Sequence, residues 1–107
     1  MHTIAETEAY KASVKLAKIS IEEQVAIVDF LALNPSAGDL IVGSGGCRKL
    51  RFARKGKGKS GGYRIITYFA NINRPLILML AYSKTQTEDL KKEQIRNLYN
   101  YVKTYEN

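Results

Sequence analysis

The sequence predicts a small α+β fold in which helices pack on one face of a mostly antiparallel sheet. Three observations support this class: apolar residues recur at helical spacing in the first third of the chain, alternate with a period of two from residue 47, and return to helical spacing after residue 91. A chain of 107 residues has room for one hydrophobic core. We therefore expect a single domain over residues 1–107.

Two helices are expected before residue 36. A short strand at His2 to Ala5 leads into a helix from Thr7 to about Lys18. Ser20 followed by Glu23 is a capping box that starts the second helix, and Asn34-Pro35 ends it. The second helix is expected to bury a stripe of Ile21, Val25, Val28 and Ala32, widened by Ile27, Phe30 and Leu31.

Three strands and a last helix are expected after a glycine-rich loop at residues 36–46. In the first strand, Cys47 to Arg54, Leu50 and Phe52 point to one face and the intervening residues to the other. The second strand is Tyr63 to Ala70, and the third, Leu76 to Tyr82, is apolar enough for the middle of a sheet. The last helix spans about residues 91–105.

The composition is that of an ordinary globular domain, with 45% hydrophobic and 25% charged residues. The single cysteine, Cys47, excludes an internal disulfide and favours a reducing compartment. The longest apolar run, from Pro75 to Tyr82, is too short to span a bilayer by a factor of about two. We therefore expect a cytoplasmic protein that does not contact a membrane.

The positive charge is confined to one segment. The net charge is +7, and residues 48–64 contain eight basic side chains and no acidic one. Such a local excess indicates a surface that binds a polyanion, with nucleic acid as the first partner to consider. The loop after residue 53 suits RNA or ribosome binding along a phosphate backbone, although a solvated loop without function is the alternative; its basic residues are Arg54, Lys55, Lys57 and Lys59.

Lys49, Arg51 and Arg64 share the polar faces of two neighbouring strands, so their cationic groups can converge on one phosphate. Lys84, just past the next strand, can join them. The equally plausible alternative is that these side chains protect the sheet from aggregation. Tyr68 and Tyr82 either stack on unpaired bases or belong to the core.

Few types of side chain in this sequence can take part in catalysis. His2 is the one histidine and lies at the terminus, so we expect neither a histidine acid–base pair nor a metal site, and no cofactor. Any reaction must therefore use lysine, arginine and tyrosine side chains.

One long segment resembles a known family. Residues 43–69, followed by Ala81-Tyr-Ser-Lys and Glu88-Asp-Leu, resemble the RelE/HigB-like toxins of bacterial type II toxin-antitoxin modules; the segment reads GSGGCRKLRFARKGKGKSGGYRIITYF. The likeness covers almost the whole chain. It implies a RelE-like toxin fold and a ribosome-dependent mRNA endoribonuclease that cuts messages in the ribosomal A site.

The resemblance also implies catalytic roles. Such toxins activate the ribose 2′-hydroxyl to attack the adjacent phosphate without a metal ion. By position, Arg64 matches the arginine that stabilises the phosphorane, Lys49 and Arg51 match two basic residues of which one acts as the base, and Lys84 lies opposite the leaving 5′-oxygen. Where some relatives have a catalytic tyrosine, this chain has Leu90, with Tyr68 or Tyr82 as substitutes.

The implied partners are mRNA on the ribosome, ribosomal RNA and a cognate antitoxin. The antitoxin is expected to be a helix-turn-helix protein through which the toxin reaches operator DNA. Two other functions stay open: a gyrase-inhibiting toxin of the ParE kind, and an RNA-binding module without catalysis. The clustered basic residues Lys49, Arg51 and Arg64 argue against the ParE kind.

Overall fold

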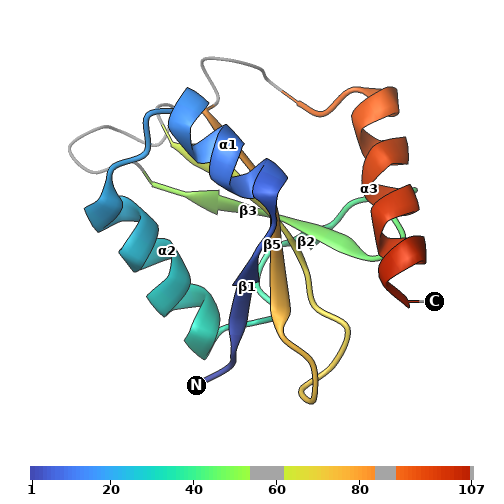
Figure 1. Cartoon of the computed structure of the whole chain (residues 1–107), viewed down its shortest axis with the longest axis horizontal. Coiled ribbons are helices and arrows are strands. Elements are labelled where there is room, and N and C mark those ends of the chain that lie inside the picture. The colour runs from blue at the N-terminus through green and yellow to red at the C-terminus, as the bar shows by residue number, and fades with distance from the viewer. Residues whose placement is uncertain (54–61, 84–88, 107) are drawn as a thin grey trace.

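A computed structural model describes residues 1–53, 62–83 and 89–106 of the chain. It contains three helices and a five-stranded sheet with the strand order β1-β5-β4-β3-β2 (Figure 1). The elements follow the chain as β1 (Ile4–Glu6), α1 (Glu8–Leu16), α2 (Ile21–Leu33), β2 (Asp39–Leu40), β3 (Cys47–Phe52), β4 (Tyr63–Tyr68), β5 (Leu76–Ser83) and α3 (Lys92–Glu106).

The α+β class is confirmed, and the sheet is mixed. Three of its strand pairings are antiparallel, whereas β1 pairs with β5 in parallel. Because the sequence between β1 and β5 holds the three other sheet strands and two helices, the parallel pairing joins distant parts of the chain. The two-residue strand β2 lies in the segment that we expected to be a loop, since so short a strand has no measurable period.

The first two helices begin and end where local chemistry predicts. The Thr7 hydroxyl accepts from the Tyr10 amide at 3.0 Å and caps α1. The capping box is present at α2: the Ser20 hydroxyl accepts from the Glu23 amide, and the Glu23 carboxylate accepts from the Ser20 amide. Helix α2 ends at Leu33, immediately before Asn34.

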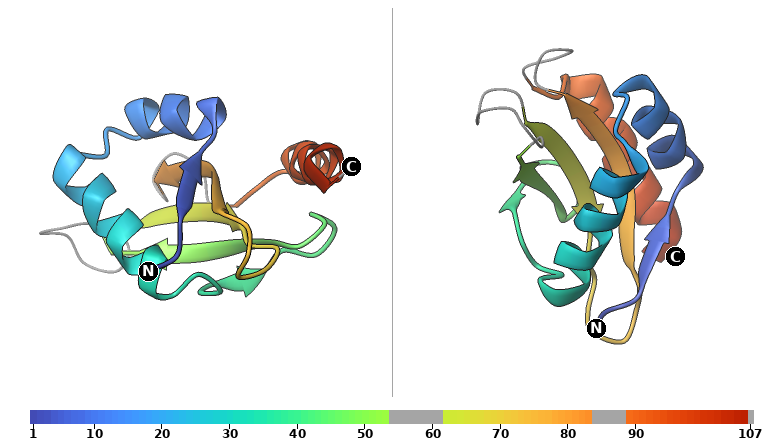
Figure 2. Two further views of the ribbon diagram at one scale, coloured as in Figure 1. Left: turned by 60° about the horizontal axis from the view of Figure 1, so that its bottom comes forward. Right: turned by 90° about the vertical axis from the view of Figure 1, so that its left-hand side faces the viewer.

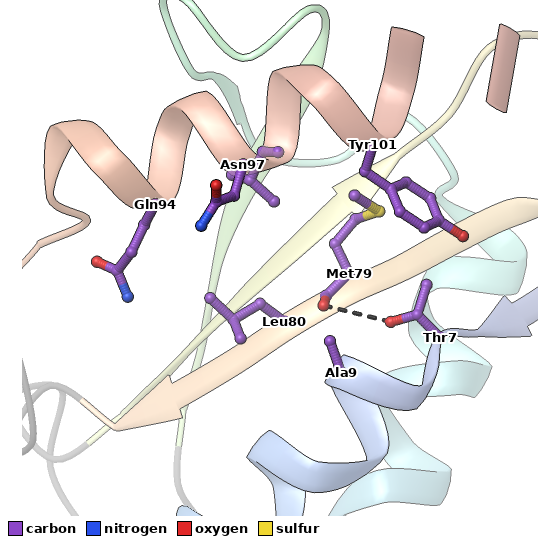
Figure 3. A pocket seen from close by; sticks show the side chains of 8 residues that line it. Thr7, Ala9, Met79, Leu80, Gln94, Asn97 and Tyr101 are labelled. Atoms are coloured by element: carbon purple, nitrogen blue, oxygen red, sulfur yellow. Dashed lines mark hydrogen bonds between the residues drawn. The ribbon is translucent and has the colours of Figure 1, made fainter. Parts of the chain in front are cut away.

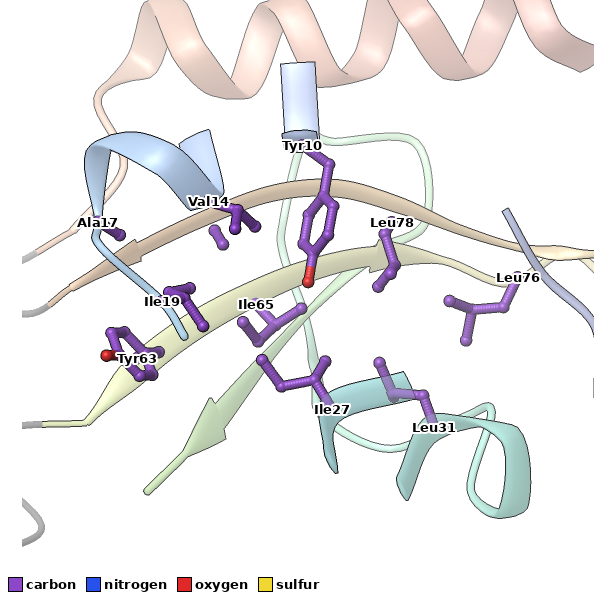
Figure 4. Packing of buried hydrophobic residues seen from close by; sticks show 11 residues of the cluster. Tyr10, Val14, Ala17, Ile19, Ile27, Leu31, Tyr63, Ile65, Leu76 and Leu78 are labelled. Atoms are coloured by element: carbon purple, nitrogen blue, oxygen red, sulfur yellow. The ribbon is translucent and has the colours of Figure 1, made fainter. Parts of the chain in front are cut away.

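The main core lies between the sheet and the first two helices (Figure 4). It combines Tyr10 and Val14 of α1 and Ile27 and Leu31 of α2 with Ile65, all nearly inaccessible to solvent. The buried face of α2 differs from the expected stripe: Ile21 is 78% exposed and Val25 is 53% exposed. Because α2 is apolar around most of its circumference, its sequence pattern does not select one face.

The expectation that all helices pack on one face of the sheet is wrong for α3. Leu98 and Val102 of α3 pack against Ile66, Met79 and other residues of the opposite sheet face. In the right-hand view of Figure 2, α2 lies in front of the strands and α3 behind them. The face that carries Lys49, Arg51 and Arg64 is therefore partly covered by α3.

A β-bulge decides which side chains of β5 reach that face. Ile66 pairs with Leu80, but the next residue, Thr67, pairs with Leu78, so Met79 is the extra residue on β5. Leu76 and Leu78 consequently point into the main core, whereas Leu80 and Tyr82 belong to the α3 side. Without the bulge, strict alternation from Leu76 would direct Tyr82 into the main core.

No helix in the described part of the chain is both long and apolar enough to cross a membrane.

Candidate functional site

Three predicted site residues lie in one row across the sheet. Arg51 of β3 pairs directly with Arg64 of β4, and Arg64 pairs directly with Tyr82 of β5. Directly paired residues point to the same face, with their Cβ atoms about 4.5–5.5 Å apart. Lys49 lies two residues from Arg51 on the same face of β3. We call Lys49, Arg51, Arg64, Tyr82 and the neighbouring Asp89 the basic cluster.

Arg64 is the most unusual member of the basic cluster. Its side chain is only 7% exposed, and within the described residues its Nη1 atom has no hydrogen-bond partner. An unpaired N–H group on a buried guanidinium is costly, and a second arginine directly across the ladder adds repulsion. Natural proteins accept such a cost mainly where function requires it, and an oxyanion between Arg51 and Arg64 would relieve both terms.

Tyr82 adds a second unpaired polar atom. Its hydroxyl is buried and has no hydrogen-bond partner among the described residues. Burial raises the pKa of Tyr82, the nearby Asp89 carboxylate raises it further, and Arg64 opposes the change. The phenol therefore stays protonated at neutral pH and can donate a hydrogen bond to a ligand bound at Arg64.

Asp89 is a site residue that the sequence analysis did not assign. Its carboxylate accepts from Lys49 Nζ at 3.1 Å and from the Leu90 amide at 2.8 Å. These two contacts, the amide first, hold the pKa of Asp89 below its ordinary value of 3.8. The available signal was a pair of acidic residues, Glu88 and Asp89, shortly after the strand that ends next to Lys84. Asp89 thereby orients Lys49 toward the site.

The pH dependence of this contact is a first prediction. A carboxyl group whose pKa is lower in the folded state contributes stability above its unfolded-state pKa, and this contribution is lost as the pH falls through the folded-state value. We expect the Asp89 carboxyl to titrate below pH 3.8 in a ¹³C NMR experiment. Lys49→Met should raise the midpoint of the Asp89 titration only part of the way to its ordinary value, because the Leu90 amide still donates to the carboxylate. An unchanged midpoint in Lys49→Met would contradict the ion pair.

Gly38 brings β2 close to the site. It has φ +100°, and a Cβ atom there would approach the Lys49 carbonyl oxygen to 2.8 Å. Only glycine therefore allows β2 to pair so closely with β3, which places Asp39 directly across from Lys49.

Tyr68, another predicted site residue, is not part of this cluster. Tyr68 lies at the opposite end of β4, across from Cys47, where it is buried and makes an edge-to-face contact with Tyr105. Leu90 is half-buried next to Asp89. The remaining predicted residues, namely Lys84, Arg54, Lys55, Lys57 and Lys59, lie outside the described residues.

Two further features do not offer chemistry of this kind. Burial raises the pKa of the Cys47 thiol to about 11, which keeps it protonated and unreactive. A pocket of about 310 Å³ between α1, β5 and α3 is lined by apolar and uncharged polar side chains such as Met79, Gln94 and Asn97 (Figure 3). No three histidine, cysteine or carboxylate side chains of the described segments lie together as a metal site.

The fold and the site define a small α+β protein with a cluster of cationic side chains on one face of its sheet. A model of the RelE toxin of the RelE/RelB toxin-antitoxin system matches residues 5–107. Because this match covers nearly the whole chain, the protein belongs to the RelE toxin family. The resemblance seen in the sequence is thereby confirmed, and membership implies a toxin with a cognate antitoxin as its partner.

Proposed function

We propose that the protein is a ribosome-dependent endoribonuclease that cleaves mRNA in the ribosomal A site and so inhibits translation. The observation that carries the proposal is the buried Arg64, with Nη1 unpaired among the described residues and with Arg51 directly across the ladder. Preorganised donors of this kind stabilise the charge that develops on a phosphorane. Membership of the RelE toxin family supports the same reading.

In the proposed reaction, the ribose 2′-oxygen attacks the adjacent phosphorus and displaces the 5′-oxygen of the next nucleotide. Arg64 and Arg51 bind the non-bridging oxygens. Lys49 is the preferred base, because a guanidinium group does not lose its proton in proteins. It takes the 2′-hydroxyl proton as a neutral amine, after its ion pair with Asp89 has opened. Lys84 protonates the leaving oxygen. The products are a 2′,3′-cyclic phosphate and a free 5′-hydroxyl.

The remaining partners follow from charge and family. Ribosomal RNA is a dense polyanion, and the basic side chains that follow residue 53 fit it. We expect Arg54, Lys55, Lys57 and Lys59 to contact RNA. The cognate antitoxin is proposed to be a helix-turn-helix protein that links the toxin to operator DNA. No part of this proposal requires a metal ion or a cofactor.

Primer extension on mRNA tests the proposal. Purified protein should cut mRNA on translating ribosomes, and Arg64→Ala and Lys84→Ala should each reduce cutting about 100-fold or more. Arg48→Ala is the matched control, because Arg48 lies on β3 but points to the other sheet face, where it donates to the Gly38 carbonyl at 3.1 Å. Its cutting should equal that of the wild type.

Two results would contradict the proposal. Uncut ribosome-bound mRNA in a culture whose growth the toxin still arrests would favour a gyrase inhibitor. RNA binding that weakens in Arg64→Ala, with no cleavage by the wild type, would indicate a binding module without catalysis.

A further inference from the structure

Lys49 lies among charges of both signs. On its own sheet face, Arg51 follows two residues along β3, and Arg64 lies diagonally across the ladder on β4. The Asp89 carboxylate contacts Lys49 directly, with Oδ1 at 3.1 Å from Nζ. Asp39 lies across from Lys49 on β2 but forms no ion pair within residues 1–53, 62–83 and 89–106. The other described side chains beside Lys49 in this pocket are apolar.

These neighbours act in opposite directions on the protonation of the Lys49 amine. A nearby cation disfavours the ammonium form of a lysine, and an anion in contact favours it. Arg51 and Arg64 therefore promote the loss of the proton, whereas Asp89 resists it. Because a general base accepts a proton only in its neutral form, the two arginines prepare Lys49 for the proposed reaction and the carboxylate opposes that reaction.

Asp89 has the charge and the exposure that this effect requires. The Leu90 amide and Lys49 hold the pKa of Asp89 below its ordinary value of 3.8, so the carboxylate is ionised near pH 7. The Asp89 side chain is 70% exposed and that of Lys49 is 33% exposed, so water can replace either partner. An ion pair this exposed shifts an equilibrium by a factor of about five at most. The contact is therefore strong enough to slow cleavage and weak enough to open in every catalytic cycle.

We propose that Asp89 is a positioning residue that restrains cleavage by holding Lys49 in its protonated form. The inference rests on the proposed function and adds a control on its rate. When the contact opens, the ammonium group gives one proton to water, and the neutral amine then accepts the proton of the ribose 2′-hydroxyl. Asp89 stays ionised and takes up no proton itself.

The same contact stabilises the free protein. Lys49, Arg51 and Arg64 carry like charges on one sheet face, and like charges placed across a sheet are destabilising. Asp89 offsets part of this repulsion while no RNA is bound. The carboxylate therefore stabilises the basic cluster and lowers the rate of cleavage at the same time.

Asp89→Asn tests the inference, because it removes the charge and keeps the Oδ1 acceptor for the Leu90 amide. Single-turnover cleavage of ribosome-bound mRNA at pH 7 should become about threefold faster. In the free protein, the titration midpoint of the Lys49 ε-carbon ¹³C signal should fall by about 0.5 pH unit, which corresponds to the same threefold change. Asp89→Glu restores the charge and should return both quantities toward their wild-type values.

Asp39→Asn is the matched control. It removes the same charge from a residue directly across from Lys49 that forms no ion pair with the amine. The Lys49 midpoint should stay within about 0.2 pH unit of the wild type, because an exposed charge without a contact is screened by water and salt. A shift as large as that in Asp89→Asn would mean that the contact has no special role, and would overturn the inference.

The two readouts separate this inference from the function on which it rests. Unchanged or slower cleavage by Asp89→Asn would overturn the restraint and leave the nuclease in place. If the wild type does not cut mRNA, the nuclease proposal fails, and the ¹³C titration still decides whether Asp89 sets the protonation of Lys49. A lower midpoint in Asp89→Asn supports that role, and an unchanged midpoint overturns it.

Discussion

Arg64→Met should reduce mRNA cleavage by 100- to 1000-fold without lowering the free energy of unfolding. The loss of activity follows from removing the donor that faces the phosphorane. The stability is expected to stay equal or to rise, because methionine fills a similar volume and removes a buried cation that lies across from Arg51. Single-turnover cleavage and urea unfolding measure the two quantities.

The control and the contrary result are both informative. Arg48→Met makes the same change on the other sheet face, where one hydrogen bond to Gly38 is lost, and should cost about 1 kcal/mol of stability with full activity. If Arg64→Met lost several kcal/mol of stability and kept its cleavage rate per folded molecule, Arg64 would be a structural residue. Such a result would remove the main support for the proposed function.

Leu31→Ala should lower the free energy of unfolding by about 2–5 kcal/mol. Leu31 is fully buried against the sheet, so truncation leaves a cavity in the main core. Leu33→Ala makes the same chemical change on the same helix, but Leu33 is 70% exposed and should change stability by less than about 0.5 kcal/mol.

Chemical denaturation of both variants checks the orientation of α2. Equal losses would mean that the helix lies rotated from the observed position. A larger loss in Leu33→Ala would mean that the exposed face is the buried one. Either result would contradict the core as described, whereas the expected difference confirms it.

The features that the sequence predicted correctly depend on neighbouring residues. The capping box at Ser20 and Glu23 and the end of α2 before Pro35 need only a few consecutive residues. The alternation in β3 was also predicted correctly: Leu50 and Phe52 pack against the main core, and Lys49 and Arg51 lie on the other face. Charge counting also needs only the residue types along the chain, and the binding of a polyanion by residues 48–64 stays a prediction.

The features that the sequence missed depend on distant contacts. The last helix was predicted, but its apolar residues, among them Leu98 and Val102, do not show by themselves which face of the sheet the helix meets. Because α2 carries apolar residues on most sides, its sequence did not predict which side would be buried. Asp89 gained its role only when the fold placed it 3.1 Å from Lys49, forty positions earlier in the chain.

The amino-acid order alone determined the class of fold, the strand that carries Lys49 and Arg51, and the resemblance to the RelE toxin family. Tertiary structure alone decided that Arg51, Arg64 and Tyr82 form one row, because strand register and the extra residue Met79 are set by pairing between distant segments. It also decided that Arg64 is buried, since burial depends on everything packed around a side chain and not on the side chain itself.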